Sequence, residues 1–397
     1  RAETASLSAR SSYHFADMAP AAVEALYGKT LPLSASKLDC FAGCRYAFFL
    51  QYGLRTLPWK QAEFDAPLFG SFVHDVLEHV VREAQAQGGF AALTDAQVAA
   101  LTERCMDACM QTYLPQGDAR ASREGYLSTR NRQEAAAVVL DVARELRLSQ
   151  FTPAAEELTF APGAQMPPIV YHASRGDGLL TGKIDRVDTY EKDGTTYFRI
   201  VDYKTGRKDF SYTDLLYGKD LQMLLYLFAL QENQKKSGHP MQPAGALYVP
   251  GRCDMIRLEP GEDVGEADTE RRKQLRRKGL VLQDEAILRA MEHYDDEPQY
   301  LPVQCKKDGL TGDLATPAQL AALERFVTGQ VAAMIDEILS GKTQPNPVDR
   351  GPADSACRWC DYSSACHKDV CAVSPRRFAA VKADEFWQEI ERRQRHG

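Results

Sequence analysis

Apolar residues recur at helical spacing along the first part of the chain. Between Phe69 and Gln87 they stand one, three or four positions apart, at Phe72, Val73, Val76, Leu77 and Val80. This is the pattern of a helix with one buried face. Similar spacing predicts helices over residues 19–27, 38–54, 96–113 and 133–148, and residues 31–38 are expected to be extended. The first 150 residues are therefore predicted to be mainly helical.

The period of the pattern changes in the middle of the chain. Leu179–Tyr190 and Thr195–Lys204 have the pattern of strands, and Lys192-Asp193-Gly194 between them is a hairpin turn signal. Residues 220–234 are apolar on nearly all sides, which predicts a buried helix. Residues 244–249 predict a further strand. This region therefore supplies the sheet of the predicted fold.

The C-terminal third returns to helical patterns. Thr316, Pro317 and Gln319 form a capping-box start for a helix that ends near Gly341. Residues 345–352 predict a loop, and residues 378–394 a polar helical tail. Helices, then strands with a helix between them, then helices again predict an α/β core with helical additions.

Charge and composition bear on function more than on fold. The 48 Lys and Arg against 55 Asp and Glu give a net charge of −7, which argues weakly against a nucleic-acid-binding surface. Without a run of eighteen apolar residues or a basic–apolar leader, the sequence predicts no membrane contact and a cytoplasmic location. Two basic clusters are interpreted either as nucleic-acid contacts or, equally well, as solvated helix faces. They are Arg271, Arg272, Lys273, Arg276, Arg277 and Lys278, and Arg120, Arg123, Arg130 and Arg132.

Asp202 and Lys204 are the most informative charged pair. They stand two positions apart on a predicted strand, so both project from one face. The hairpin could bring Asp185 close to Asp202. Two neighbouring carboxylates repel unless a cation lies between them, and a metal ion there would activate water for attack on phosphorus. Lys204 would orient that water or stabilise charge on a phosphate. The competing interpretation is an ordinary amphipathic hairpin with surface charges.

Three further polar residues are candidates for the same site. His74 follows Gly70 by four positions on the first long predicted helix and could be a metal ligand. Gln222 and Tyr226 lie four positions apart and share a helix face, from which they could hydrogen-bond a phosphate or water. The alternatives are a histidine with a structural role and a polar stripe on an apolar helix.

The chain has ten cysteines, and without a secretory signal their use in metal binding is the better expectation. Cys357, Cys360 and Cys366 form a C-x2-C-x5-C group. A fourth ligand must come from elsewhere, with Cys40, Cys44, Cys371 and His367 as candidates. Spacing alone does not separate zinc from an iron–sulfur cluster.

Two stretches look like the end of a nucleotide-binding Walker A loop, Gly28-Lys29-Thr30 and Gly341-Lys342-Thr343. That loop also requires a glycine five positions before the Gly-Lys pair, where this chain has Val23 and Asp336. The sequence therefore predicts that this chain binds no ATP.

Taken together and in order, these motifs resemble the RecB-like PD-(D/E)XK nucleases that carry an iron–sulfur cluster. Two further stretches, at 247–250 and 278–280, are more specifically similar to the AddB-type nuclease domains of bacterial helicase–nucleases. Arg45 departs from the family pattern, which has proline after the first cluster cysteine. The matching segments are residues 33–38, 41–46, 69–74, 182–188, 201–206 and 222–226, with Cys44, Cys357, Cys360 and Cys366.

The resemblance implies a restriction-endonuclease-like fold, with a mixed central sheet flanked by helices and a C-terminal iron–sulfur staple. It implies Mg²⁺ or Mn²⁺ held by His74, Asp185, Asp202 and the carbonyl of Tyr203. It also implies a [4Fe–4S] cluster on Cys44 and the C-x2-C-x5-C group. The expected partners are single-stranded DNA and an AddA-type helicase subunit of a bacterium.

The expected organisation is a lead-in over residues 1–30, a nuclease domain over 31–375 and a helical tail over 376–397. The expected function is metal-dependent cleavage of DNA, with catalytic roles for Asp185, Asp202, Lys204, Gln222 and Tyr226. Two rival functions are a DNA-docking module with an inert site and a stand-alone nuclease of the CRISPR-associated type. Retention of both carboxylates, His74 and Lys204 argues against the first, and length together with the AddB-like stretches argues against the second.

Overall fold

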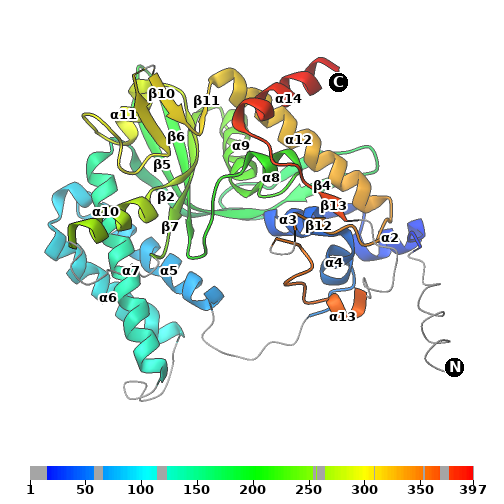
Figure 1. Ribbon diagram of the computed structural model, residues 1–397, viewed down its shortest axis with the longest axis horizontal. Helices are drawn as coiled ribbons and strands as arrows, with labels where there is room; N and C mark the ends of the chain where they lie inside the picture. Colours follow the sequence, from blue (N-terminus) through cyan, green and yellow to red (C-terminus); the bar gives the residue numbers. More distant parts are fainter. Residues whose placement is uncertain are drawn as a thin grey trace.

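A six-stranded sheet forms the centre of the molecule in the computed structural model (Figure 1). The structure describes residues 16–57, 66–113, 123–253, 256, 264–307, 309–351, 354–366 and 375–396. The strand order is β11-β8-β7-β6-β5-β2. The strands are β2 (Thr152–Phe160), β5 (Gly182–Lys192), β6 (Thr195–Lys204), β7 (Gln242–Pro250), β8 (Lys278–Leu282) and β11 (Leu314–Ala315).

The central sheet is mixed, as predicted. β5 pairs antiparallel with both β2 and β6, whereas β6 and β7 run parallel. Parallel neighbours need a crossover connection, and helix α9 (Gln222–Lys236) lies within the one between β6 and β7. The hairpin of β5 and β6 turns at Asp193 and Gly194, both with positive φ, which is the geometry of a tight hairpin turn. The predicted hairpin is confirmed.

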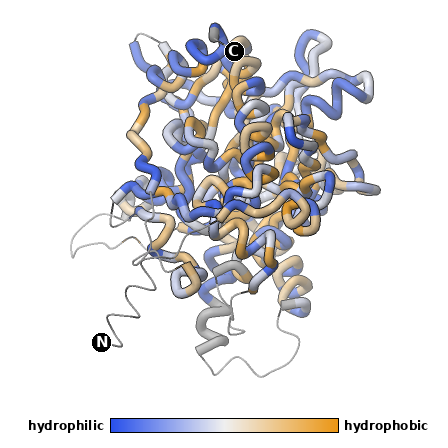
Figure 2. The backbone as a smooth tube through the Cα atoms, turned by 90° about the vertical axis from the view of Figure 1, so that its right-hand side faces the viewer, coloured by the Kyte–Doolittle hydropathy of each residue, from blue (hydrophilic) through white to orange (hydrophobic). Residues whose placement is uncertain are grey.

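Helices cover both faces of this sheet and give two hydrophobic cores. On one face, α5 (Ala66–Ala86), α6 (Asp95–Tyr113) and α7 (Arg123–Leu148) pack against Val201, Tyr203 and Val249. The other face packs against α9, α12 (Pro317–Leu339) and α14 (Ala383–His396). In Figure 2 the apolar stretches of the chain gather toward the middle of the molecule. The α/β architecture predicted from the sequence is confirmed.

The remaining elements are short and lie around these layers. β1 (Thr30–Leu33), β4 (Asp177–Leu180) and β3 (Ile169–His172) form a second sheet, β9 (Val303–Lys306) pairs with β10 (Gly309–Gly312), and β12 (Val348–Asp349) pairs with β13 (Arg376–Arg377). The other helical segments are α2 (Pro20–Tyr27), α3 (Ala35–Gly43), α4 (Arg45–Phe48), a π-helix (Phe49–Gly53), a 3₁₀ turn (Phe90–Ala92), α8 (Tyr212–Leu216), α10 (Val264–Leu275), α11 (Glu285–Met291) and α13 (Ser363–Cys366).

Several predicted boundaries are wrong for identifiable reasons. The extended segment 31–38 ends early, because the Ser34 side chain accepts a hydrogen bond from Lys37 N and caps α3. The helix predicted over 38–54 is interrupted at Cys44, which is extended. The strand predicted over 179–190 is divided at Thr181, where the chain passes from the small sheet into the central one.

The C-terminal region also differs in detail from the prediction. The helix that starts at Thr316 has its capping box and ends at Leu339, as expected. The tail begins at Ala383 rather than 378 and is amphipathic rather than simply polar, with Phe386, Trp387 and Ile390 buried against the core. The loop predicted over 345–352 contains the short strand β12. Among the described residues, no helix combines the length and apolar character needed to cross a bilayer.

Candidate metal centre and its surroundings

The β5–β6 hairpin places Asp185, Asp202 and Lys204 at one end of the central sheet. Arg186 lies opposite Val201 in the antiparallel register, so Asp185 falls beside the end of β6. Asp185 Oδ2 accepts a hydrogen bond from the backbone N–H of Tyr203 at 2.8 Å. Lys204 Nζ lies 2.6 Å from Asp202 Oδ2. The structure thus brings together the three charged residues that the sequence singled out.

Helix α5 supplies His74 to this group. His74 Nε2 lies 2.7 Å from the carbonyl oxygen of Tyr203, and Nδ1 lies 3.3 Å from Asp185 Oδ2. One turn earlier on α5, a Cβ added to Gly70 would lie 3.1 Å from Thr205 Oγ1. The absence of a side chain at Gly70 therefore lets α5 approach the end of β6 closely, which brings the imidazole to Asp185 and to the carbonyl of Tyr203.

Helix α9 supplies Gln222 and Tyr226. Gln222 Nε2 donates to Asp202 Oδ1 at 2.8 Å, and Gln222 Oε1 accepts from Lys204 Nζ at 3.3 Å. Tyr226 hydrogen-bonds the Gln222 side chain and the backbone of Lys183. A Cβ on Gly182 would meet the Tyr226 ring at 2.7 Å, so glycine is required there. Gln222 therefore bridges the carboxylate and the ammonium, and Tyr226 holds Gln222.

The electrostatics of the carboxylates favour a bound cation. Burial raises the pKa of Asp202 to about 6, and the charge of Asp185 adds to this, although Lys204 and His74 oppose it. Asp202 Oδ2 is buried and faces the ammonium of Lys204 without a well-directed hydrogen bond. Burial lowers the pKa of His74, but hydrogen bonding and attraction to Asp185 outweigh it, so the pKa is raised. These residues fit a divalent metal, because its charge would relieve the repulsion between the acids.

Glu157 is a member of this group that the sequence analysis missed. Potential ligand atoms of His74, Glu157 and Asp185 all lie within 4.8 Å of one another. Glu157 lies on β2, opposite the Asp185 region of β5, and it has a positive φ of 51°. Such a conformation is strained for a residue with a side chain and is often found at functional sites. The backbone of β2 therefore departs from regular geometry at the residue that approaches Asp185.

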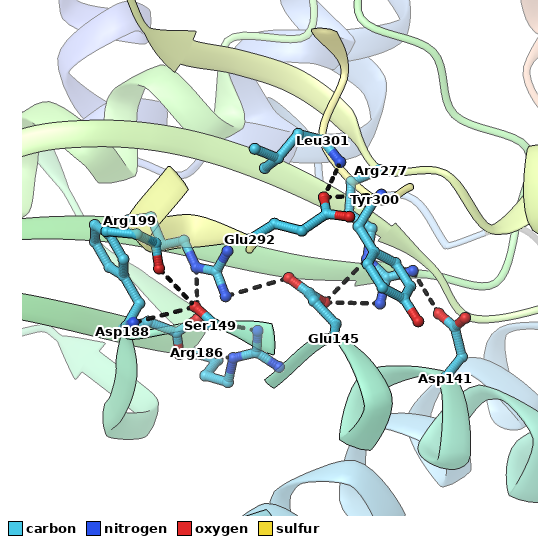
Figure 3. A network of polar contacts seen from close by, with 12 residues as sticks. Asp141, Glu145, Ser149, Arg186, Asp188, Arg199, Arg277, Glu292, Tyr300 and Leu301 are labelled. Atoms are coloured by element: carbon cyan, nitrogen blue, oxygen red, sulfur yellow. Dashed lines mark hydrogen bonds and ion pairs between the residues drawn. The ribbon is translucent and has the colours of Figure 1, made fainter. Parts of the chain in front are cut away.

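A buried network of charges lies beside the site and ties helix α7 to the hairpin (Figure 3). Arg186 and Arg199 both donate to Asp188 at 2.8 Å, and Arg277 Nη2 donates to Glu145 at 2.7 Å. Arg199 Nη2 also lies 3.2 Å from Glu145 Oε1. All three guanidinium groups are fully buried.

The network reaches the candidate metal centre through Arg186. This residue follows Asp185 directly, and its Nη1 donates to the hydroxyl of Tyr203 at 2.7 Å. Burial alone would raise the pKa of Glu145, but Arg277, Arg199 and Arg186 lower it to about 2. Glu145 therefore stays ionised and helps to fix the strands from which Asp185 and Tyr203 project.

The four predicted cluster cysteines gather at a separate place, away from the sheet. Cys44, Cys357, Cys360 and Cys366 all line one small cavity, together with Tyr46 and Tyr362. Cys40 is outside this lining, and its thiol lies 3.4 Å from Gln51 Oε1. His367 and Cys371, the other candidate ligands, lie outside the described residues. Four thiols around one cavity match the ligand set of a tetrahedral metal or a [4Fe–4S] cluster.

Both segments that resemble a Walker A loop follow the end of a helix. Gly28 is the residue after α2, and Gly341 follows α12 by two positions. The C-terminal end of a helix carries partial negative charge, which disfavours a bound phosphate. The geometry therefore gives no support for nucleotide binding at Lys29 or Lys342.

Comparisons with known proteins point to a family of nucleases. A family model described as the PD-(D/E)XK nuclease superfamily matches residues 32–367. The chain is 31% identical over 387 residues to an ATP-dependent helicase/deoxyribonuclease subunit of the B type from Thermoanaerobacter sp. (strain X514), covering 94% of this chain and 33% of that protein. The protein of the same name from Caldanaerobacter subterraneus is 32% identical over 359 residues, with 87% and 30% covered.

A third relative of that name, from Acetivibrio thermocellus, is 31% identical over 375 residues, with 92% of this chain and 32% of the relative covered. The chain thus spans about a third of the length of the curated relatives it matches. The family model, in contrast, covers most of the chain and includes each candidate residue of the metal centre. The chain belongs to the PD-(D/E)XK nuclease superfamily.

Proposed function

We propose that this chain is a metal-dependent deoxyribonuclease that hydrolyses phosphodiester bonds of single-stranded DNA. The observation that carries the proposal is the convergence of Asp185, Asp202 and Lys204 with His74 and Glu157 at the end of the β5–β6 hairpin. Paired carboxylates beside an ammonium suit attack of water on phosphorus. The names of the curated relatives support DNA as the substrate.

In this proposal each residue has a distinct role. Mg²⁺ or Mn²⁺ would be held by Asp185, Asp202, His74, Glu157 and the Tyr203 carbonyl. The ion would supply an activated water and neutralise charge on the phosphate. Lys204 orients the water or stabilises negative charge on the transferred phosphate. Gln222 keeps Lys204 and the Asp202 carboxylate in register through its two hydrogen bonds, and Tyr226 orients Gln222.

The wider context of the proposal rests on the relatives. Their name joins a helicase to a deoxyribonuclease, and this chain matches about a third of their length. We infer that strands opened elsewhere in an AddAB-type complex reach this site, with an AddA-type helicase subunit as partner and ATP bound outside this chain. Repair and recombination of broken DNA in the bacterial cytoplasm would be the corresponding role.

Incubation of the pure chain with single-stranded DNA and Mg²⁺, with and without a chelator, tests the proposal. Metal-dependent shortening of the DNA is expected, without any requirement for ATP. Binding of DNA without cleavage under all metal conditions would instead favour the rival function of an inert docking module. Efficient cleavage would fit both a subunit of a helicase–nuclease complex and a stand-alone nuclease. Purification of the protein from its own cells distinguishes the two, because only the first should bring a helicase subunit with it.

The cysteine cavity is proposed to hold a structural [4Fe–4S] cluster on Cys44, Cys357, Cys360 and Cys366. Protein purified without air is expected to be brown and to contain iron and sulfide. Cys366→Ser should lose this colour and fold poorly, because the cluster joins residues more than three hundred positions apart.

Cys105→Ser is the matched control for the cluster prediction. Cys105 is buried between helices and does not line the cavity, so this variant should keep its colour and its iron. Zinc in place of iron in the anaerobic preparation would contradict the assignment of the cluster.

A further inference from the structure

A second cavity, basic in character, opens directly beside Lys204. It has a volume of about 330 Å³ and lies between the loop that follows β6, the end of β7, helix α10 and the start of β8. Its cationic lining residues are Lys204, Arg207, Lys208, Arg252, Lys273 and Lys278. We call this set the basic pocket. Because Lys204 belongs to both, the basic pocket is continuous with the candidate metal centre.

The charge of the basic pocket runs against the charge of the whole chain. The net charge of the chain is −7, yet six cationic side chains line the pocket, with the carboxylates of Asp209 and Glu270 among them. Three more carboxylates, those of Asp202, Asp220 and Glu134, pair with Lys204, Lys208 and Arg252 from outside the lining, which leaves more cations than acids. One of these carboxylates serves two partners, since Asp209 lies 3.6 Å from Arg207 and 3.9 Å from Lys278. A local surplus of positive charge in a concave site attracts an anionic ligand.

The cations of the basic pocket differ in how firmly they are held. Lys208 is paired with Asp220 at 2.5 Å, and the ammonium groups of Lys204 and Lys208 lie 5.9 and 5.6 Å from the centre of the Tyr248 ring. Arg207 and Lys273 have side chains that are 90% and 70% exposed, with long ion pairs to exposed acids. Such exposed pairs contribute little, so these two side chains can turn to a ligand at small cost.

We propose that the basic pocket binds the phosphates of the substrate strand on one side of the bond that is cut, with Arg207 and Lys273 as contact residues. This inference rests on the proposed function for the nature of its ligand, a polynucleotide strand. The repeating negative charge of that strand suits a pocket that has several cations in its lining, Lys204 among them. The pocket would hold the strand in register, and the metal centre would cut it.

The double variant Arg207→Gln/Lys273→Gln tests this proposal through binding alone. Affinity for a fluorescent single-stranded oligonucleotide is measured by anisotropy in the presence of a chelator, so that cleavage plays no part. Loss of two phosphate contacts should lower the slope of log affinity against log salt by about 1.4. Between about 50 and about 200 mM salt, the wild type should then lose about sevenfold more affinity than the variant.

Two exposed cations outside the basic pocket, Arg104 and Lys236, provide a matched control. Lys236 is 65% exposed and 3.3 Å from Glu232, much as Lys273 is 3.3 Å from Glu270. Arg104 is 64% exposed and 3.5 Å from Glu83, which resembles the pair of Arg207 with Asp209. The variant Arg104→Gln/Lys236→Gln removes the same charge and should keep the wild-type salt slope. An equal fall in both double variants would mean that only net charge matters, and would overturn the proposal.

Oligonucleotides with neutral methylphosphonate linkages locate the contact along the strand. Neutral linkages on one side of the cut should weaken binding to the wild type and have no further effect on Arg207→Gln/Lys273→Gln. Equal sensitivity of both proteins on both sides would overturn the pocket assignment. Binding and cleavage are measured separately. If the wild type cleaves DNA but Arg207→Gln/Lys273→Gln has the same salt slope as the wild type, only the inference about the pocket is refuted. If the double variant has the lower salt slope but the wild type does not cleave DNA, only the proposed function is refuted.

Discussion

Lys204→Ala is expected to lower the rate of DNA cleavage by a factor on the order of 10³, the upper end of the loss caused by removing one key electrostatic group in other enzymes. The Lys204 ammonium lies 2.6 Å from Asp202 and is held by Gln222 at 3.3 Å, which directs its charge into the candidate metal centre. Asp202→Ala should have a similar effect on rate. Initial rates on single-stranded DNA with saturating Mg²⁺ provide the measurement.

The Asp202→Ala variant should remain folded. Removing the Asp202 carboxylate relieves its repulsion with Asp185, so the midpoint of thermal unfolding should not fall. Lys192→Ala is the control, because Lys192 ends β5 at the turn of the same hairpin, away from the metal centre. Wild-type rates in either Lys204→Ala or Asp202→Ala would show that this assignment of the active site is wrong.

Glu145→Gln is expected to lower the free energy of unfolding by about 3–5 kcal/mol, the range for breaking a buried ion pair. The three buried arginines of the network are balanced by Asp141, Glu145 and Asp188. Neutralising Glu145 leaves an uncompensated positive charge among groups that have no access to water. Chemical denaturation at neutral pH, monitored by circular dichroism, measures the change.

Arg144→Gln, one position away on α7, is the control for this prediction. Arg144 is 55% exposed and pairs with Asp95 at 2.8 Å, and exposed pairs contribute about 0–1 kcal/mol. The pKa of Glu145 is lowered to about 2 in the folded protein, so its stabilisation is complete above its unfolded pKa of about 4.3. The gap between wild type and Glu145→Gln should therefore narrow as pH falls from about 4.3 toward 2. Similar losses in both variants at neutral pH would argue against a special role for the network.

Local signals were sufficient for the hairpin that carries the candidate site. The alternation of β5 and β6 and the turn at Asp193 and Gly194 are encoded within about twenty-five residues, and the structure follows them. The helix that carries His74 is likewise clear from its apolar spacing. These elements are predictable because hydrophobic period and turn chemistry agree with the tertiary structure.

Features that depend on residues far away in the sequence could not be predicted from local patterns. β2 has a weak strand pattern, with Pro153, Ala154 and Ala155 near its start and a bulge there, so Glu157 could not be placed beside Asp185. The interruption at Cys44 coincides with a hydrogen bond from Arg45 N to Asn346 Oδ1, a contact that no local pattern encodes. Arg186 and Arg199 look like surface charges in the sequence, and only the fold reveals their buried partners.

Helices α3 and α4 contact segments that are synthesised much later. Arg45 and Asn346 are 301 positions apart, and Arg376 donates to the carbonyl of Ala42 across 334 positions. At ordinary rates of translation, on the order of 15–60 s pass between the emergence of Arg45 and that of Asn346 from the ribosome. During that interval α3 and α4 lack their native partners, whereas the β5–β6 hairpin can form as soon as it is synthesised. The region around Cys44 is therefore among the last to complete its native contacts during synthesis.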